Sequence, residues 1–324
     1  MIWGKSNYHS ANADAGINSV RSIIFTQFDR GYEEGAGALL NSAVRAGYRG
    51  DFVFGYKDEP PYWLKNYRRK GDSCFEVAGC MLYIYKEDTE RHLGFQKPFA
   101  AFDIFERFPG YEAIFYFDAD CTLVGAWSFF EGWVQCGIGL VQDVNFPELC
   151  ITHPWRVHWV KLLKGAGYPV SETASDKYPN GGYFCIKRQD RDFLLCWMAI
   201  TLEFEKQGGD TRHYDMSNRW KAVVSDQDLM AAAVMAWKDP VCYVGPVGMG
   251  FTGYLFLIAH AIESPKPWKR SHLLHALQGT PPSPAARAYL QNTNGPVAVL
   301  SAIQRLIAHL DLAAGKLVGR VWKR

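Results

Sequence analysis

Short apolar runs alternate with a helix-length segment near the start of the chain. The run 21–28 (RSIIFTQF) predicts a strand, the segment 35–46 (GAGALLNSAVRA) predicts a helix, and 50–56 (GDFVFGY) predicts a second strand. Strand, helix and strand at this spacing are typical of a βαβ unit, in which the two strands lie parallel in one sheet. The pattern therefore predicts an α/β fold.

The run 113–117 (AIFYF) contains only apolar and aromatic positions, so we expect both of its faces to be buried, as in a central parallel strand covered by helices. A helical region before it is expected to face the core through four residues: Phe99, Phe102, Ile104 and Phe105. Later segments predict a strand at 181–187, a helix at 228–237 and a strand at 254–259.

The C-terminal part combines helical hydrophobic spacing with basic residues. The segment 280–286 (TPPSPAA) is predicted to be a hinge. Beyond it, apolar residues recur at helical spacing: Val297, Leu300, Ile303, Leu306, Ile307, Leu310, Ala314, Leu317 and Val321. We therefore expect an α/β domain over 1–280 and a basic amphipathic helical tail over 281–324. Such a tail can contact a membrane surface through 297–324, or pack on the domain with its basic face in water.

Charge and composition exclude several classes of protein. The 324 residues are 48% hydrophobic and 15% aromatic, which favours a large core over disorder. The net charge of +2 conceals a charge of +5 over 281–324 and −3 elsewhere, and it gives no electrostatic footprint for nucleic acid.

The cysteines and the apolar stretches bear on location. Eight cysteines without a CxxC pair favour a reducing cytoplasm over a disulfide framework. The first residues lack the pattern of a signal peptide. The apolar stretch 244–262 is broken by four glycines, Pro246 and His260, so it does not predict a membrane span. We expect a cytoplasmic protein that can lie peripherally on the inner face of the membrane.

Two acids, Asp118 and Asp120, follow the apolar run 113–117 directly. A D-x-D motif places two carboxylates close enough to share a divalent cation, and oxygen ligands suit Mg²⁺ or Mn²⁺. Crevices form outside the carboxyl ends of parallel strands, which favours a functional role. A solvated turn at the end of a strand explains the same two residues.

A distant segment strengthens the functional interpretation. His260 lies six residues before Lys266, which begins a Lys-Pro-Trp sequence. Together with the D-x-D motif, this arrangement resembles the family 8 glycosyltransferases, retaining nucleotide-sugar enzymes that include glycogenin and bacterial lipopolysaccharide galactosyltransferases. The resemblance implies a GT-A (Rossmann-like) fold. It also implies that Asp118, Asp120 and His260 hold Mn²⁺ or Mg²⁺ on a nucleotide diphosphate, with Lys266 on the phosphates. Without the resemblance, His260 reads as a satisfied core residue.

The same resemblance assigns the remaining candidate residues of the donor site. Thr26 and Tyr32 would frame the uridine, with Tyr32 as a stacking platform, and Lys97 would contact a phosphate or the ribose. Packing of Tyr32 on the core and a solvated helix-start lysine are the alternatives. Two family-like motifs, N-G-G and D-Q, supply the sugar contacts: Asn180, Gly181, Asp226 and Gln227. An ordinary glycine turn and a helix N-cap are the competing explanations.

The resemblance covers roughly residues 20–270 and has departures. Family members usually carry Phe and Gly where this chain has Ala261 and Glu263. In the family this Gly allows the backbone to contact a phosphate, so the resemblance does not extend to that contact. The segment 141–178 is rich in Trp, His and Pro, and Trp155 or Trp159 could stack on acceptor sugars or pack in the core.

These observations lead us to expect Mn²⁺-dependent, retaining transfer of a hexose, glucose or galactose, from a UDP-sugar to a glycan or lipid-linked glycan, as in bacterial polysaccharide or lipopolysaccharide synthesis. Gln227 is a poor nucleophile, so its carbonyl would stabilise positive charge at the anomeric carbon. Both a covalent and a front-face route are open. The alternatives are a metal-dependent sugar-phosphate nucleotidyltransferase and a non-catalytic carbohydrate-binding protein with the same fold.

Overall fold

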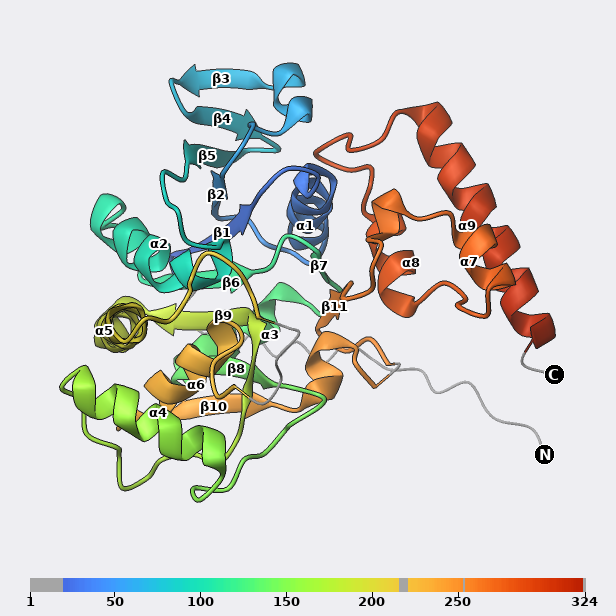
Figure 1. The fold of residues 1–324 in the computed structure, drawn as a ribbon. Coiled ribbons are helices and arrows are strands. Elements are labelled where there is room, and N and C mark those ends of the chain that lie inside the picture. Colours follow the sequence, from blue (N-terminus) through green and yellow to red (C-terminus); the bar gives the residue numbers. More distant parts are fainter. Residues whose placement is uncertain (1–19, 216–220, 253, 323–324) are drawn as a thin grey trace, which may run out of the picture.

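The computed structural model describes residues 20–215, 221–252 and 254–322. Nine strands form one sheet in the order β10-β8-β9-β6-β1-β2-β5-β4-β3, and two short strands, β11 and β7, form a second sheet (Figure 1). The strands are β1 Ser22–Phe28, β2 Asp51–Tyr56, β3 Arg68–Gly71, β4 Cys74–Val77, β5 Cys80–Lys86, β6 Ala113–Phe117, β7 Cys121–Leu123, β8 Ile138–Gln142, β9 Pro179–Lys187, β10 Val241–Val244 and β11 Ile258–His260.

Helices cover both faces of the large sheet. They are α1 Glu33–Arg45, α2 Leu93–Arg107, α3 Trp127–Gln135, α4 Pro154–Gly165, α5 Asp192–Lys206, α6 Asp226–Ala236, α7 His272–Leu277, α8 Pro284–Gln291 and α9 Ala302–Trp322. The described residues also contain four short 3₁₀ segments: Tyr62–Asn66, Arg188–Asp190, Pro246–Met249 and Pro267–Lys269. Among the described helices, none is long and apolar enough to cross a bilayer.

The predicted βαβ unit is confirmed. β1 and β2 pair in parallel with Phe25 opposite Val53, and α1 connects them. β6 also pairs in parallel with β1, so the carboxyl ends of β1, β2 and β6 lie at one edge. On its other side β6 pairs with β9 in antiparallel fashion, so the sheet is mixed.

The two faces of β6 confirm that this strand is buried on both sides. Phe115 and Phe117 pack in the core shared with α1 and α3, whereas Ile114 and Tyr116 pack in the core shared with α2, α4, α5 and α6. The side chains of successive strand residues point to opposite faces, so this segment needs apolar residues at every position.

Two sequence expectations need correction. The core side of α2 includes Ile104 and Phe105 as predicted, and Phe102 is partly buried and packs against the same core, but Phe99 is partly exposed and is not part of it. The strand predicted at 254–259 is wrong, because only Ile258–His260 pairs, with β7. In the preceding residues Tyr254 and Phe256 are 77% and 50% exposed, so hydrophobicity there does not indicate a buried strand.

The C-terminal segment contacts the α/β core before α9 begins. Val297 lies ahead of α9, is fully buried, and its backbone bonds to the side chain of Asn41 on α1. The predicted hinge at 280–286 is in part the first turn of α8, whose N-cap is Ser283. α8 packs on β7, β11 and α1, and α7 packs on α9 (Figure 1). The domain boundary at residue 280 stays a prediction.

Candidate active site

The D-x-D motif lies where β6 leaves the sheet. The backbone N–H of Asp118 donates to the carbonyl of Gly182 on β9 (2.9 Å), and the Tyr116 hydroxyl donates to the Asp118 carboxylate (2.6 Å). Cys121 then begins β7, which pairs with β11. The chain therefore passes from the large sheet to the small one through Asp118, Ala119 and Asp120.

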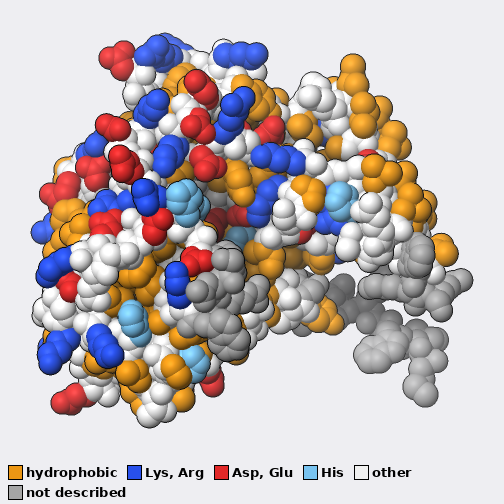
Figure 2. Space-filling view, viewed as in Figure 1, with side chains coloured by type: hydrophobic (Ala, Val, Ile, Leu, Met, Phe, Trp, Pro, Cys, Tyr) orange, Lys and Arg blue, Asp and Glu red, His pale blue; other side chains and the backbone are white. Residues whose placement is uncertain are grey.

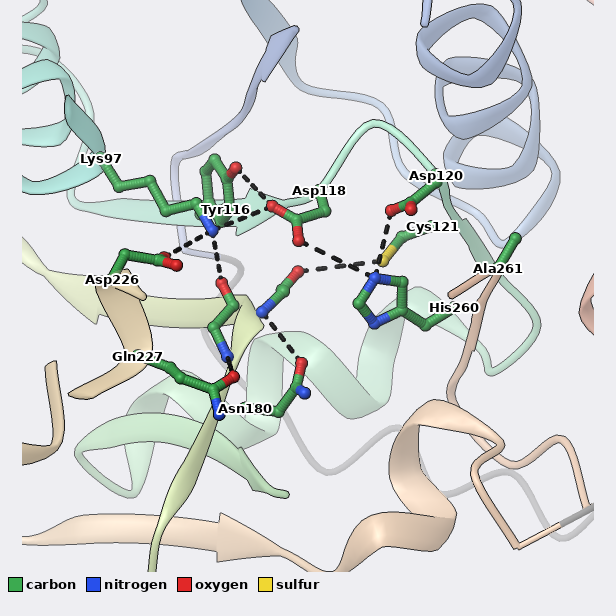
Figure 3. Close-up of polar contacts among 12 residues, drawn as sticks. Lys97, Tyr116, Asp118, Asp120, Cys121, Asn180, Asp226, Gln227, His260 and Ala261 are labelled. Atoms are coloured by element: carbon green, nitrogen blue, oxygen red, sulfur yellow. Dashed lines mark hydrogen bonds and ion pairs between the residues drawn. The ribbon is translucent and has the colours of Figure 1, made fainter. Parts of the chain in front are cut away.

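The small sheet brings His260 to the two acids. His260 lies opposite Cys121 in the β7–β11 pair, and its Nε2 is 3.1 Å from Asp120 Oδ1 and 3.8 Å from Asp118 Oδ2 (Figure 3). The three proposed metal ligands are therefore together, with two carboxylates facing one imidazole nitrogen. Hard oxygen donors with one imidazole fit Mn²⁺ or Mg²⁺. Nδ1 of His260 is buried without a hydrogen-bond partner among the described residues.

Cys121 was not a candidate from the sequence, but its thiol lies in the same cluster. Ligand atoms of Asp120, Cys121 and His260 all lie within 4.8 Å of one another. Burial raises the pKa of the Cys121 thiol well above its usual value, and the nearby Asp120 and Asp118 carboxylates add to this. A protonated thiol is a poor ligand, so the carboxylates and the imidazole are the stronger donors.

Lys266 closes the cluster from the C-terminal side. Its Nζ is 2.6 Å from Asp120 Oδ2 and 2.7 Å from the carbonyl oxygen of Ala261. Burial alone would raise the pKa of the Asp120 carboxyl, but His260 and Lys266 more than offset this and hold that pKa well below its usual range. Asp120 therefore stays ionised and can bind a cation.

Lys97 is buried and fully engaged. Its Nζ lies 3.0 Å from Asp118 Oδ1, 2.8 Å from Asp226 Oδ2 and 2.8 Å from the carbonyl oxygen of Gly181. Burial alone would lower the pKa of Lys97, but the two carboxylates more than offset this and raise it above its usual value. Three partners use the three ammonium protons, so Lys97 orients the acids and is not a solvated lysine.

Two cavities meet at the acids, and the face of the molecule is hollowed there (Figure 2). The first, of about 350 Å³, extends past Tyr32 and the end of β1; the second, of about 420 Å³, extends past Asn180, Gly181 and Gln227. They share four lining residues: Lys97, Asp118, Asp120 and Tyr214.

Most residues predicted for the donor site line these cavities. Tyr32 lies in the first, with Nζ of Lys266 and of Lys269 5.8 and 5.7 Å from its ring centre. Thr26 is fully buried within β1 and lines neither cavity. The end of β1 contributes three unpredicted residues to the first cavity: Gln27, Phe28 and Asp29.

The residues predicted to contact the donor sugar form hydrogen bonds within the site. Asn180 donates to Asp143 (3.1 Å) and accepts from the backbone N–H of Gly182 (3.0 Å). The backbone N–H of Gly181 donates to the Gln227 carbonyl oxygen (3.3 Å), as drawn in Figure 3. A Cβ on Gly181 would lie 3.0 Å from Asp226 Oδ2, so glycine permits this close approach.

The two candidate acceptor tryptophans differ in position. Trp159 is 1% exposed and belongs to the core, whereas Trp155 lines the second cavity beside Phe146, with ring centres 5.2 Å apart. Glu263, a departure from the resemblance, accepts a hydrogen bond from Ser283 at the start of α8 (2.6 Å).

Comparisons with known proteins bear on the fold. No family model matches the sequence, and a search of curated proteins found no match. A solved structure of the WbbM bifunctional glycosyltransferase in its apo form is similar, with a TM-score of 0.52 and 13% sequence identity over 92% of this chain. The matched part covers 53% of the length of the WbbM chain, so this chain spans about half of it. The mixed sheet covered by helices on both faces and this likeness together show a GT-A-like glycosyltransferase fold.

Proposed function

We propose that this protein is a metal-dependent retaining glycosyltransferase that moves a hexose, glucose or galactose, from a UDP-sugar to a glycan or lipid-linked glycan. The observation that carries the proposal is the meeting of two cavities at Asp118 and Asp120. A UDP-sugar has two bulky ends joined by a diphosphate, and a diphosphate needs cations at that junction. The cavity beside Tyr32 would take the uridine and the cavity beside Gln227 would take the hexose.

Asp118, Asp120 and His260 would hold Mn²⁺ or Mg²⁺, because their donor atoms converge and their chemistry suits these ions. When bound, the cation supplies Lewis-acid stabilisation of the negative charge on the leaving diphosphate. Lys266 lies beside the same acids and would add a second positive charge at the phosphates.

The contacts of the acids favour a front-face route. Each carboxylate that lines the second cavity within the described residues is bound by the protein: Asp118, Asp120, Asp143, Asp226 and Asp228. None is a free nucleophile. In the proposed step the bond from the anomeric carbon to the phosphate oxygen breaks, and the bond to the acceptor oxygen forms on the same face. The acceptor proton passes to the departing diphosphate, while the Gln227 carbonyl stabilises positive charge on the sugar.

Trp155 and Phe146 would form the acceptor side of the site. They stand in the second cavity with Asp143 and Asn145, so the pocket offers an aromatic face beside polar groups. This combination suits a sugar ring, which stacks through its C–H face and bonds through its hydroxyls.

The proposal is tested by measuring product release from a panel of UDP-sugars, with and without Mn²⁺. A hexosyltransferase releases UDP and gives a product with the anomeric configuration of the donor, which NMR of the product detects. A nucleotidyltransferase, supplied with pyrophosphate, instead converts the UDP-sugar to UTP and a sugar 1-phosphate. If neither chemistry occurs with any donor while glycans bind, the chain is a binding protein. If Asp120→Asn leaves UDP binding and turnover unchanged, the metal site is refuted.

A membrane contact through the C-terminal helix belongs to the same proposal, because a lipid-linked acceptor lies at a membrane surface. Ile303, Leu306 and Ile307 on α9 are 73%, 61% and 60% exposed. Leu310, Leu317 and Val321 continue this stripe at helical spacing, and the buried side of α9 contains Leu312. Arg305 and Arg320 are on the same helix and suit anionic headgroups. The side of α9 that faces water therefore carries a stripe of apolar residues as well as basic ones.

Sedimentation with vesicles tests the contact. We expect the full chain to bind vesicles that contain anionic lipid and to bind neutral vesicles weakly. Leu306→Glu with Leu310→Glu should abolish sedimentation, whereas Leu202→Glu, at a 47% exposed leucine of α5, should not. Equal sedimentation of both variants would refute the contact through α9.

A further inference from the structure

Three side chains that line the second cavity form a hydrogen-bond chain that ends at Gln227. The Tyr178 hydroxyl donates to Asp228 Oδ1 (2.6 Å), and Gln227 Nε2 donates to the same hydroxyl oxygen (3.0 Å). Asp228 Oδ2 accepts from the backbone N–H groups of Val224 (2.8 Å) and Ser225 (3.0 Å). Asp228 and Tyr178 are 2% and 3% exposed, so water competes little for these bonds.

The direction of the bonds fixes the amide of Gln227. An ionised carboxylate only accepts, so the single hydroxyl proton of Tyr178 goes to Asp228. The hydroxyl oxygen must then accept from its other neighbour, which turns the NH₂ group of Gln227 toward it. The carbonyl of Gln227 therefore points the other way, where the Gly181 N–H donates to it (3.3 Å). The second lone pair of that carbonyl is left for the cavity.

The tyrosine is held rigidly. Its ring stacks on Trp159 with centres 5.9 Å apart and an interplanar angle of 9°. Its backbone N–H donates to the carbonyl oxygen of Pro147 (3.0 Å), and its carbonyl oxygen accepts from the backbone N–H of Asp143 (2.9 Å). A hydroxyl on a ring clamped in this way can orient a neighbour, because it cannot follow that neighbour when it moves.

We propose that Tyr178 and Asp228 are positioning residues that fix and polarise the Gln227 amide, so that its carbonyl presents negative charge to the donor sugar. The inference rests on the proposed function and deepens it. A carboxylate at one end of a hydrogen-bond chain polarises every bond along it, so the carbonyl at the other end gains partial negative charge. Such a group stabilises a positively charged anomeric carbon more strongly in the transition state than in the ground state.

The first test needs neither donor nor activity. In ¹⁵N-labelled protein the side-chain amide signal of Gln227, assigned by its absence in Gln227→Ala, is followed by NMR from pH 5 to 8. Burial raises the pKa of Asp228 to about 6. Protonated Asp228 would donate to Tyr178, the hydroxyl proton would turn toward Gln227, and the amide of Gln227 would have to rotate to accept it through its carbonyl oxygen. We expect the Gln227 signal to titrate near that pH in the wild type and to stay constant in Tyr178→Phe and in Asp228→Asn.

Other titratable groups around Asp228 set the control. Asp226 is on the same helix and pairs with Lys97, Tyr214 donates to Asp226, and Asp143 lies near Tyr178. If one of these produced the titration, it would persist in Asp228→Asn, and the inference would be overturned. A signal that does not respond to pH in the wild type overturns it as well.

Kinetics provide the second test, with a double-mutant cycle. We expect Tyr178→Phe to lower kcat by about tenfold to a hundredfold with KM for the donor nearly unchanged. In the Gln227→Ala background the same change should have no further effect. Tyr243→Phe removes a hydroxyl whose hydrogen bond within the described part of the chain goes to the backbone carbonyl of Lys177 (3.4 Å), and it is the matched control. Equal losses from Tyr178→Phe in both backgrounds would mean that Tyr178 acts independently of Gln227. A wild type inactive with every donor refutes the proposed function, while the NMR titration still decides the inference.

Discussion

Lys266 and Asp120 are 146 positions apart in the chain, and their side chains form an ion pair of 2.6 Å at the centre of the site. The ammonium group also bonds to the Ala261 carbonyl (2.7 Å), so it is held beside the carboxylate. Under the proposed function, an incoming diphosphate meets this ammonium group and the acids together. Binding would then transfer Lys266 in part from Asp120 to a phosphate oxygen.

Replacing Lys266 with methionine should therefore weaken UDP binding by about tenfold to a hundredfold, because the leaving phosphate loses a charge partner. Binding of Mn²⁺ alone should not weaken, since Asp120 loses a competing cation. Calorimetric titration of each ligand measures both effects. Lys164→Met, at an exposed lysine of α4, is the control, and equal UDP affinity in the two variants would contradict the role of Lys266.

Gly182→Ala should damage the metal site through His260. A Cβ at Gly182 would lie 2.5 Å from His260 Cε1, so the imidazole ring must move. We expect Mn²⁺ affinity to fall by roughly tenfold or more, because small displacements of a ligand weaken a metal site. Gly132→Ala on α3, where a Cβ meets nothing within 4 Å, should leave Mn²⁺ affinity unchanged. Equal Mn²⁺ affinity in the two variants would place the cation away from His260.

The lowered pKa of Asp120 should make the free energy of unfolding fall at low pH. The pKa of its carboxyl is below the unfolded value in the native state, because His260 and Lys266 outweigh the effect of burial. The stabilisation is thus fully present above about pH 4 and is lost as pH falls below that. Asp120→Asn should flatten the fall in unfolding free energy between about pH 4 and pH 2.5, as measured by urea titration. If the unfolding free energy of Asp120→Asn falls as steeply with acid as that of the wild type, Asp120 is not the group that causes the loss.

The raised pKa of Asp228 should make the free energy of unfolding fall as pH rises. Burial raises the pKa of its carboxyl to about 6, so the native state holds a proton that the unfolded chain has released. The associated stability is present below about pH 4 and is lost as pH rises through 6, by up to about 3 kcal/mol. Asp228→Asn should remove this loss and unfold at a higher temperature than the wild type at pH 7.5. Asp228→Asn should nevertheless lower kcat, because an amide donates to Tyr178 and turns the Gln227 carbonyl away.

The local patterns predicted the fold well where hydrophobicity and burial agree. β1, α1, β2 and β6 follow directly from their apolar spacing, and the sheet confirms them. The run 254–259 fails as a prediction because its aromatic side chains are exposed, and composition alone does not show whether an apolar residue is covered. Whether β9 joins parallel or antiparallel depends on the path of the whole chain and not on local pattern.

The site was predictable only in part. Asp118, Asp120, His260 and Lys266 became candidates because motifs in a fixed order resemble those of a known family, and the structure brings these four side chains together. Tyr178 and Cys121 were not, since one is a tyrosine before a turn and the other a cysteine in an apolar run. Their positions come from pairings between distant segments, which a local pattern does not encode. Lys97 was found, but its burial between two acids was not expected.

The short β7–β11 pair has a consequence for the order in which the protein gains its binding capacity. Asp118 and Asp120 follow a strand of the central sheet, but His260 and Lys266 join them only when the later segment docks and α8 covers the pair. During synthesis the two carboxylates are made well before β11, so a chain made only as far as β10 would lack His260, one of the three proposed cation ligands. Nucleotide affinity would then act as a late checkpoint, present only in molecules whose C-terminal segment has found its place.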